Sequence, residues 1–175
     1  MKRLFSLILL LAILLLTVSC REKIDTSELV CHELDGVKFS LPRYMRRAEN
    51  EDYDAAFDNM RIFFSVKRIT DEMLDTVDVS REDGADAYFN ALMSKSGLDK
   101  SSVYLERFDH SKLISFRYSY DASRGEGEKD IILYYVILAG EGDNFWYFEI
   151  CAKEADGIKN ISNFETWRNT IILTK

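Results

Sequence analysis

Ile131-Ile-Leu-Tyr-Tyr-Val-Ile-Leu138 is the stretch that decides the fold, because all eight of its residues are apolar or aromatic. A strand with one solvent-facing side alternates apolar and polar residues, whereas this run offers apolar side chains to both sides. Its β-branched and aromatic residues favour a strand over a helix. We therefore expect a central strand that is covered on both faces.

The segments on either side of this run predict its neighbours in an antiparallel sheet. Residues 114–120 alternate between apolar and polar side chains, and residues 145–152 form a second aromatic segment of strand length. The loops at 121–130 and 139–144 carry two glycines each, which is typical of hairpin connections. Further strands are expected at residues 29–32, 37–41 and 62–67 and around Phe57, which makes a sheet of about six strands.

Two segments have the spacing of helices that pack on this sheet. The first runs from Ser80, whose spacing to Asp83 resembles a capping box, to Gly97, a residue type that often ends a helix. The second covers residues 158–171, with Ser162 as a possible later start, and residues 71–79 are expected to be irregular. Because the central strand is apolar on both sides, we predict helices on both faces. This is an α/β/α sandwich of the α+β class.

The amino-terminal segment has a different composition from the rest of the 175 residues. Lys2 and Arg3 make a basic start, and residues 4–16 are apolar apart from Ser6. Such a start, followed by an apolar run and small residues, indicates a secretory signal. The apolar run is shorter than the roughly 20 residues that a transmembrane helix needs.

A cysteine at the end of this segment makes the prediction more specific. Leu16-Thr-Val-Ser-Cys20 resembles the lipobox that bacterial lipoprotein-processing enzymes recognise, although Thr17 stands where leucine is commonest. The resemblance implies cleavage after Ser19, a diacylglyceryl group on the Cys20 thiol and acylation of the new amino terminus. Anchoring becomes stable when about two acyl chains are attached. The alternatives are an ordinary signal peptide with an unrelated cysteine, and an uncleaved amino-terminal anchor.

The expected organisation is a signal peptide at 1–19, a lipidated tether at 20–28 and a single α+β domain at 29–175. Arg21 follows Cys20 in place of the aspartate that retains some lipoproteins in the inner membrane. The cell envelope is therefore the expected location, and the outer membrane is favoured over the inner where a bacterium has both.

The expected mature chain is acidic. Without Lys2 and Arg3 it has 21 basic and 30 acidic residues, a formal charge of −9. Such a charge argues against nucleic acid as a partner and against electrostatic binding of anionic lipid headgroups by the surface as a whole. The expected partners are the lipid bilayer, through acylated Cys20, and a protein of the envelope.

Two cysteines remain in the expected domain, Cys31 and Cys151. Both lie in segments of strand character, and an even pair in an exported protein permits a disulfide. The alternative is two free thiols, because cysteine often serves as a small apolar residue.

The sequence predicts no catalytic residues, no metal site and no cofactor. The two histidines, His32 and His110, stand outside any nucleophile motif. The acidic residues 71–86 lack the order of an EF-hand, so a solvated acidic surface is the simpler interpretation. One basic cluster consists of Arg43, Arg46 and Arg47, which can contact lipid headgroups, contact an acidic partner, or form a solvated edge that balances nearby acidic residues.

Aromatic residues are the most suggestive feature of the domain, at 13% of the chain. Tyr134, Tyr135, Trp146 and Tyr147 lie on the two strands expected at the centre of the sheet. Aromatic clefts suit sugars, peptides or apolar ligands, so these four residues are the predicted ligand cleft. The alternative is that they pack between the sheet and its helices.

The order of segments resembles a known superfamily. Gly36-Val-Lys-Phe-Ser-Leu-Pro42 ends an early strand in Leu-Pro, and Phe145-Trp-Tyr-Phe-Glu-Ile150 precedes a closing helix with Phe164 and Trp167. Behind a lipobox, this order resembles the PsbP/Mog1/DcrB-like lipoproteins over residues 29–175. The resemblance implies an α/β/α sandwich and a non-enzymatic accessory or binding protein, without shared catalytic residues.

The expected function is therefore a membrane-anchored, non-enzymatic binding or accessory module of the cell envelope. One alternative is an envelope hydrolase that uses carboxylates in an aromatic-lined cleft, for which two facing acids would be needed. Another is a structural lipoprotein without a small-molecule ligand.

Overall fold

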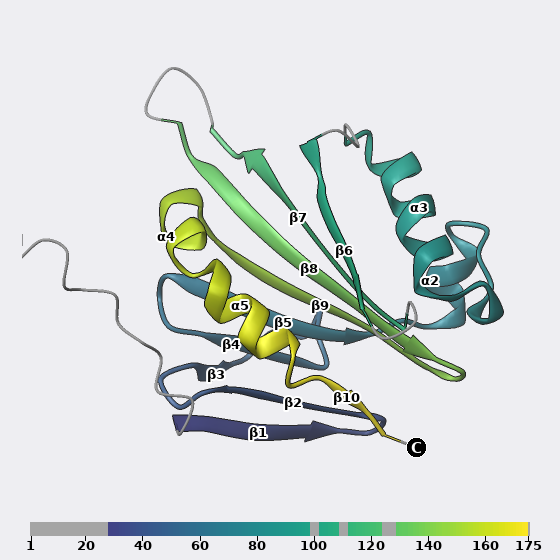
Figure 1. Cartoon of the computed structure of the whole chain (residues 1–175), viewed down its shortest axis with the longest axis horizontal. Coiled ribbons are helices and arrows are strands. Elements are labelled where there is room, and N and C mark those ends of the chain that lie inside the picture. Colours follow the sequence, from purple (N-terminus) through teal and green to yellow (C-terminus); the bar gives the residue numbers. More distant parts are fainter. Residues whose placement is uncertain (1–27, 99–101, 109–111, 124–128, 175) are drawn as a thin grey trace, which may run out of the picture.

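A computed structural model describes residues 28–98, 102–108, 112–123 and 129–174 (Figure 1). Cys20, the expected signal peptide, residues 20–27 of the tether and His110 lie outside the described residues. The described chain forms two antiparallel sheets with helices on both faces of the larger one.

The large sheet has seven strands in the order β3-β4-β5-β9-β8-β7-β6. Its two longest strands, β8 and β9, lie at or beside the centre and pair through a tight hairpin. The predicted central run therefore occupies β8, flanked on both sides by paired strands. The bounds are β3 Arg46–Ala48, β4 Ala55–Asp58, β5 Ile62–Arg68, β6 Tyr104–Phe108, β7 Leu113–Asp121, β8 Ile131–Glu141 and β9 Asn144–Lys153.

The small sheet has three strands in the order β1-β2-β10. β1 (Leu29–Leu34) and β2 (Val37–Pro42) form a hairpin, and β10 (Ile172–Leu173) joins its other edge near the carboxyl terminus. Figure 1 shows this sheet below the large one. The first and last described strands of the chain thus lie side by side.

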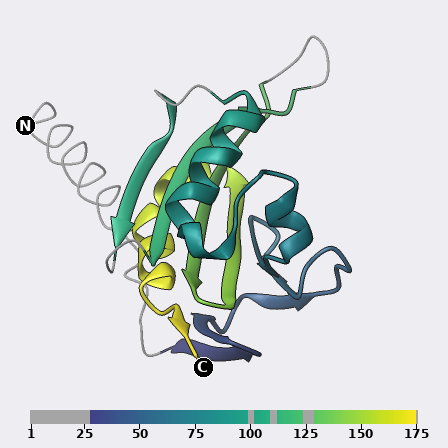
Figure 2. The same ribbon diagram turned by 90° about the vertical axis from the view of Figure 1, so that its right-hand side faces the viewer.

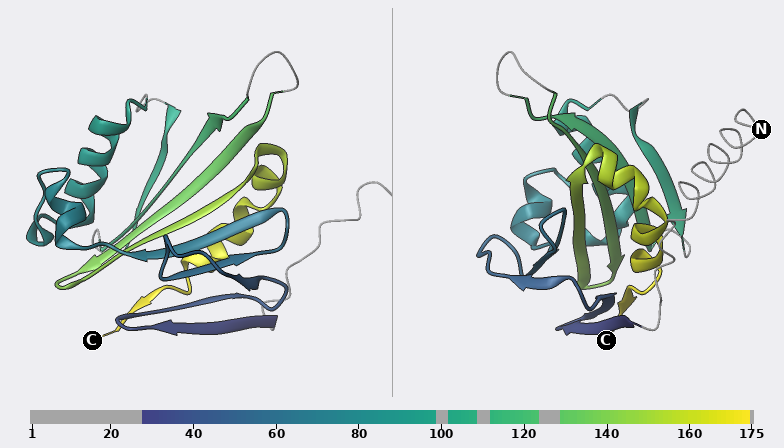
Figure 3. Two further views of the ribbon diagram at one scale, coloured as in Figure 1. Left: turned by 180° about the vertical axis from the view of Figure 1, so that it is seen from behind. Right: turned by 90° about the vertical axis from the view of Figure 1, so that its left-hand side faces the viewer.

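The helices cover opposite faces of the large sheet. α2 (Asp71–Asp75), the 3₁₀ turn η2 (Arg81–Asp83) and α3 (Gly84–Ser96) lie on one face, in front of the sheet in Figure 2. α4 (Glu154–Lys159) and α5 (Ile161–Arg168) lie on the other face, as the right-hand view of Figure 3 shows. The predicted α/β/α arrangement of the α+β class is confirmed.

Two hydrophobic cores result, one on each face. The first lies between the large sheet, the small sheet and α5, and contains a chain of rings that runs from Phe39 through Phe64 to Trp167. The second lies between the large sheet and α3, where Tyr88 packs on Phe145 and Phe89 on Phe116. Because side chains alternate along a strand, β8 and β9 contribute to both cores.

Three details differ from the sequence-based expectations. The strands form two sheets of seven and three strands and not one sheet of about six, because β2 pairs with β1 on one side and with β10 on the other and not with the large sheet. Residues 71–75 form α2, because Thr70 caps its start and Leu74 is buried. The single helix expected at 158–171 starts earlier and is broken at Asn160, whose ψ of 9° is non-helical. Ser162 is therefore not a helix start.

Candidate functional site

A row of polar and aromatic side chains occupies the part of the large sheet that continues beyond α3, on the same face. Glu149 of β9 is paired with Val136 of β8 and with Ser65 of β5. Val136 belongs to the core under α3, so these side chains share the face that α3 covers in part. We call this surface the acid–tyrosine face, and its members are Tyr53, Phe63, Ser65, Tyr118, Tyr134, Tyr147, Glu149 and Cys151.

Glu149 is the acidic group of this face. Its side chain is partly buried, and the Tyr147 hydroxyl donates a hydrogen bond of 2.6 Å to its Oε2. Burial raises the pKa of Glu149, and the hydrogen bond from Tyr147 lowers it by a smaller amount. The pKa of Tyr147 is also raised, first by burial and then by the nearby Glu149 charge. The Glu149 carboxyl thus occupies a poorly hydrated position, in which the Tyr147 hydroxyl donates one short hydrogen bond to it.

Tyrosine rings surround this carboxyl on two sides. Tyr118 and Tyr134 stack with ring centroids 5.1 Å apart, and Tyr53 meets Phe63 edge-on at 5.9 Å. Burial, together with the Glu149 charge, raises the pKa of Tyr118 to about 12, and burial raises the pKa of Tyr53 and Tyr134. All these hydroxyls therefore remain protonated donors at neutral pH.

Cys151 lies at the end of this face, opposite Phe63 and Tyr134. Burial and the Glu149 charge raise the pKa of its thiol to about 11, so the nucleophilic thiolate is scarce at neutral pH. Cys31 lies in the small sheet and is exposed, and both thiols are free. Of the two alternatives that the sequence left open, the structure has the free thiols and not the Cys31–Cys151 disulfide.

The structure divides the predicted ligand cleft between the two faces of the sheet. Tyr134 and Tyr147 belong to the acid–tyrosine face, and both are partly exposed. Tyr135 and Trp146 point the other way and are only 3% and 2% exposed, within the core under α5. The four residues therefore do not form one cleft, because neighbours on a strand point to opposite faces.

Glu149 itself is the residue that sequence reasoning missed. It is the only acidic residue in β9, whose other central residues are apolar, aromatic or cysteine. A lone carboxylate in such a strand is a visible signal, because burial of an unpaired charge is costly and therefore uncommon. Tyr118 was placed correctly on its strand, but its stacking on Tyr134 depends on the register between β7 and β8.

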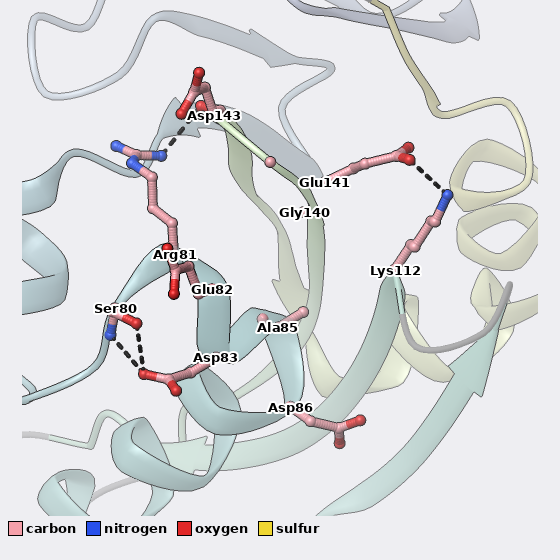
Figure 4. Close-up of a pocket in the computed structure, with 12 residues that line it drawn as sticks. Ser80, Arg81, Glu82, Asp83, Ala85, Asp86, Lys112, Gly140, Glu141 and Asp143 are labelled. Atoms are coloured by element: carbon pink, nitrogen blue, oxygen red, sulfur yellow. Dashed lines mark hydrogen bonds and ion pairs between the residues drawn. The ribbon is translucent and has the colours of Figure 1, made fainter.

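A second surface feature is a polar hollow of about 880 Å³ between the start of α3 and the β8–β9 hairpin (Figure 4). Its charged groups bind one another. Arg81 pairs with Asp71 at 2.5 Å and donates to the Asp143 carbonyl at 3.1 Å, and Lys112 pairs with Glu141 at 2.7 Å. The Arg81 contact ties the β8–β9 hairpin to η2, and the Lys112 pair ties β8 to the start of β7, so the hollow is explained as a structural junction.

The remaining candidates from the sequence are distributed as follows. His32 packs on the rings of Phe39 and Phe57, with its centroid 4.5 Å from that of Phe57, and burial lowers its pKa. Among the described residues, no three His, Cys, Asp or Glu side chains converge as metal ligands. No helix within the described ranges is long and apolar enough to cross a membrane.

Comparison with known proteins identifies the fold. No protein-family model matches the chain, and no curated protein matches its sequence. The solution structure of cyanobacterial PsbP (CyanoP) from Synechocystis sp. PCC 6803 is similar, with a TM-score of 0.51, 13% identity and coverage of 89% of this chain and 98% of that one. The Ran-binding protein Mog1p of Saccharomyces cerevisiae aligns at a TM-score of 0.49, with 11% identity over 83% of this chain and 95% of that one. At such identities the similarity concerns the backbone arrangement, and the chain therefore has a PsbP-like fold.

Proposed function

We propose that this chain is the precursor of a lipid-anchored, non-enzymatic binding module of the bacterial cell envelope, and that the acid–tyrosine face is its binding surface. The observation that carries the proposal is the position of Glu149, a partly buried carboxyl that accepts one hydrogen bond from the side chains of the described residues. A carboxylate accepts about four hydrogen bonds, so capacity for a ligand remains.

The anchor rests on the Leu16-Thr-Val-Ser-Cys20 sequence and on the position of the domain behind it. The described domain begins at Glu28, so the segment from Cys20 to residue 27 contains eight residues, Cys20 included. Fully extended, they span at most about 28 Å. The domain is thus expected to work close to the bilayer.

The chemistry of the face favours recognition over catalysis. Stacked tyrosines offer flat aromatic surfaces with hydroxyl donors, and Glu149 offers an acceptor. A ligand with an amine or amide donor beside an apolar or ring-shaped portion would match both.

The hydrolase alternative receives less support from the same geometry. Hydrolysis of glycosidic bonds by carboxylates needs two of them about 5–9.5 Å apart. The pKa of Glu149 is shifted by burial and by Tyr147, and no other described carboxyl contributes to the shift. The Cys151 thiol is a poor substitute nucleophile because its pKa is raised.

The test is purification of the tagged native protein from envelopes in mild detergent, beside Cys20→Ala and Glu149→Gln. Intact mass should show acyl chains on the native protein and on Glu149→Gln, but not on Cys20→Ala. A partner or ligand that copurifies should be lost from Glu149→Gln and kept by Glu33→Gln, an exposed carboxylate of the small sheet. A native protein without lipid contradicts the anchor, and equal retention by both glutamine variants contradicts the binding surface.

A further inference from the structure

The end of the domain at which the described chain begins is basic. The Arg43 backbone N–H donates to the Glu28 carbonyl at 3.1 Å, so Arg43 lies beside the first described residue. Arg46 and Arg47 follow as the first two residues of β3, and all three arginines are exposed. Figure 1 shows the start of β1 and strand β3 on the same side of the molecule.

The β4–β5 hairpin brings an exposed apolar side chain to this end. Arg46 is paired with Asp58, so residues 59–61 of the hairpin turn lie next to it. Met60 is 101% exposed and has a φ of 70°, an uncommon conformation for a residue with a side chain. The Asn59 side chain accepts from Ile62 N–H at 2.8 Å and supports this turn. The turn therefore directs the apolar side chain of Met60 into solvent.

The arginines at this end are not neutralised by the domain. Among the described residues, none of Arg43, Arg46, Arg47 and Arg61 forms an ion pair, whereas Arg68, Arg81, Arg107 and Arg168 each do. Asp58, the acidic residue opposite Arg46, accepts instead from Met60 N–H at 3.4 Å. The acidic residues 49–54 follow the far end of β3, where Ala48 pairs with Ala56.

A small hollow of about 270 Å³ continues this surface between the hairpin turn and the ends of β8 and β9. Phe63 and Ile132 supply apolar lining, and Arg61 and Lys153 supply positive charge. Lys153 pairs with Asp130 at 3.3 Å, so Arg61 is the cation of the hollow without an ion-pair partner among the described residues.

We propose that this basic end, made of Arg43, Tyr44, Arg46, Met60 and Arg61, seats the domain on an anionic lipid bilayer. The arginines contact anionic headgroups, and Met60 enters the boundary between headgroups and acyl chains. The inference rests on the proposed lipid anchor, because the eight residues 20–27 keep this end within about 28 Å of the bilayer.

Two physical arguments select the bilayer as the occupant. The chain outside the described domain leads from this end to the proposed lipid, which places the patch next to a membrane. The charge is also polarised, since the expected mature chain has 30 acidic against 21 basic residues, while this end has three exposed arginines, Arg43, Arg46 and Arg61, without an ion-pair partner in the described part of the chain. An anionic surface thus attracts this end and repels most of the remaining surface, which orients the domain.

The test places a fluorophore at Met60. The full-length protein carrying Met60→Trp is reconstituted in nanodiscs of phosphatidylcholine with or without phosphatidylglycerol, and its emission is quenched with brominated lipids. The native Trp146 and Trp167 are 2% and 1% exposed, so they give a constant background. We expect strong quenching and a blue shift in the anionic discs, and a loss of both at high salt because salt screens the headgroup charge.

Two controls separate this seating from general proximity to the membrane. Ile172→Trp places the probe at a residue that is 60% exposed in β10 and should stay unquenched. Arg43→Gln, Arg46→Gln and Arg61→Gln together should weaken seating by about 100-fold, since each basic residue near an anionic surface contributes roughly fivefold. A matched control removes the same amount of charge from three cations that form ion pairs within the domain, by Lys38→Gln, Arg68→Gln and Lys112→Gln. This control should leave the affinity for the anionic bilayer unchanged.

The outcomes distinguish the seating from the anchor. If the protein carries acyl chains but the tryptophan of Met60→Trp stays in water, the seating is overturned while the anchor stands, and an acidic protein becomes the better occupant. Equal quenching in neutral and anionic discs overturns the role of the arginines. Equal quenching of the Ile172→Trp control overturns the orientation.

Discussion

Glu149 is held in the middle of a sheet, where its charged form is poorly hydrated. Its pKa is raised above the model-compound value of 4.5, mainly by burial. The folded chain therefore binds the Glu149 proton more tightly than the unfolded chain does. By linkage, the contribution of this group to stability is fully present below pH 4.5 and is lost as the pH rises through the raised pKa.

Glu149→Gln should remove that pH dependence. We expect the variant to gain stability relative to the wild type as the pH rises above 4.5, because glutamine has no charge to bury. Urea unfolding at several pH values measures the difference. Glu33→Gln is the control, since Glu33 is exposed in the small sheet. A constant difference between Glu149→Gln and the wild type at all pH values would contradict the raised pKa.

Arg168 is a second residue whose environment is unusual, because a charged side chain is almost completely buried. Its guanidinium donates to Glu106 at 2.7 Å and to the Tyr135 hydroxyl at 2.9 Å, and it lies 3.7 Å from the centre of the Phe108 ring. With a further hydrogen bond to the Ser115 hydroxyl of β7 at 3.2 Å, these contacts fasten the end of α5 to three strands of the large sheet, β6, β7 and β8. Glu106 is 28% exposed, which limits the strength of the ion pair.

Replacing Arg168 by methionine should destabilise the fold by about 3 kcal/mol, because Tyr135 and Glu106 lose a charged donor. Chemical denaturation followed by tryptophan fluorescence gives the value. Arg107→Met is the matched control, since Arg107 forms an exposed ion pair with Asp86 and should cost less than about 1 kcal/mol. Equal losses of unfolding free energy in the two variants would show that the buried contacts of Arg168 stabilise the fold no more than an exposed ion pair does.

Among the elements, α4 depends on one glycine. A Cβ at Gly157 would lie 2.6 Å from Leu133 Cδ2, so the helix can approach β8 this closely only without a side chain. The closing helix is broken into α4 and α5 at Asn160. α4 follows β9 directly and is pressed against the sheet, whereas α5 must cross toward β2.

Gly157→Ala should therefore destabilise the protein by about 1–3 kcal/mol through overpacking. In an unpacked helix the same change would stabilise by about 1 kcal/mol, so the sign of the effect is diagnostic. The measurement is the free energy of unfolding in urea. Adding Leu133→Val should recover part of the loss, and a stabilising Gly157→Ala would contradict the close contact.

At the scale of the whole molecule, the carboxyl-terminal segment joins the two sheets. The Thr174 backbone N–H donates to Gly36 in the small sheet at 2.9 Å, and Asn144 of the large sheet donates to the Thr174 carbonyl at 2.6 Å. Thr170 adds a contact to β2, because the Ser40 backbone N–H donates to the Thr170 hydroxyl oxygen at 2.8 Å.

Removal of residues 170–175 should loosen the small sheet selectively. Hydrogen exchange should accelerate in β1 and β2, because β10 no longer covers an edge and the bonds to Gly36 and Ser40 are lost. The central strands β8 and β9 should keep their protection. Asn144→Ala removes one of these bonds and should give a smaller effect, whereas uniform acceleration would show that the two sheets unfold together.

Several features could be predicted from local sequence because they depend on neighbouring residues alone. The apolar run at 131–138 indicates a strand covered on both faces, and Gly97 ends its helix in the left-handed conformation that glycine favours. The amino-terminal apolar segment and Cys20 also form a local pattern, from which a leader and its processing are predicted. Side chains alternate between the two faces of a strand, which separates Tyr134 from Tyr135 on β8 and Trp146 from Tyr147 on β9. The division of the predicted cleft could therefore have been predicted from the sequence.

Other features were decided only by tertiary structure, because they depend on which distant segments meet. The register between β5 and β9 places Ser65 beside Glu149, and that between β7 and β8 stacks Tyr118 on Tyr134. The separation of β1, β2 and β10 into their own sheet follows from a pairing between the two ends of the domain. Side-chain pattern specifies which face of a strand is buried. It does not specify the partner strand, because many apolar strands offer similar burial and only the assembled core selects among them.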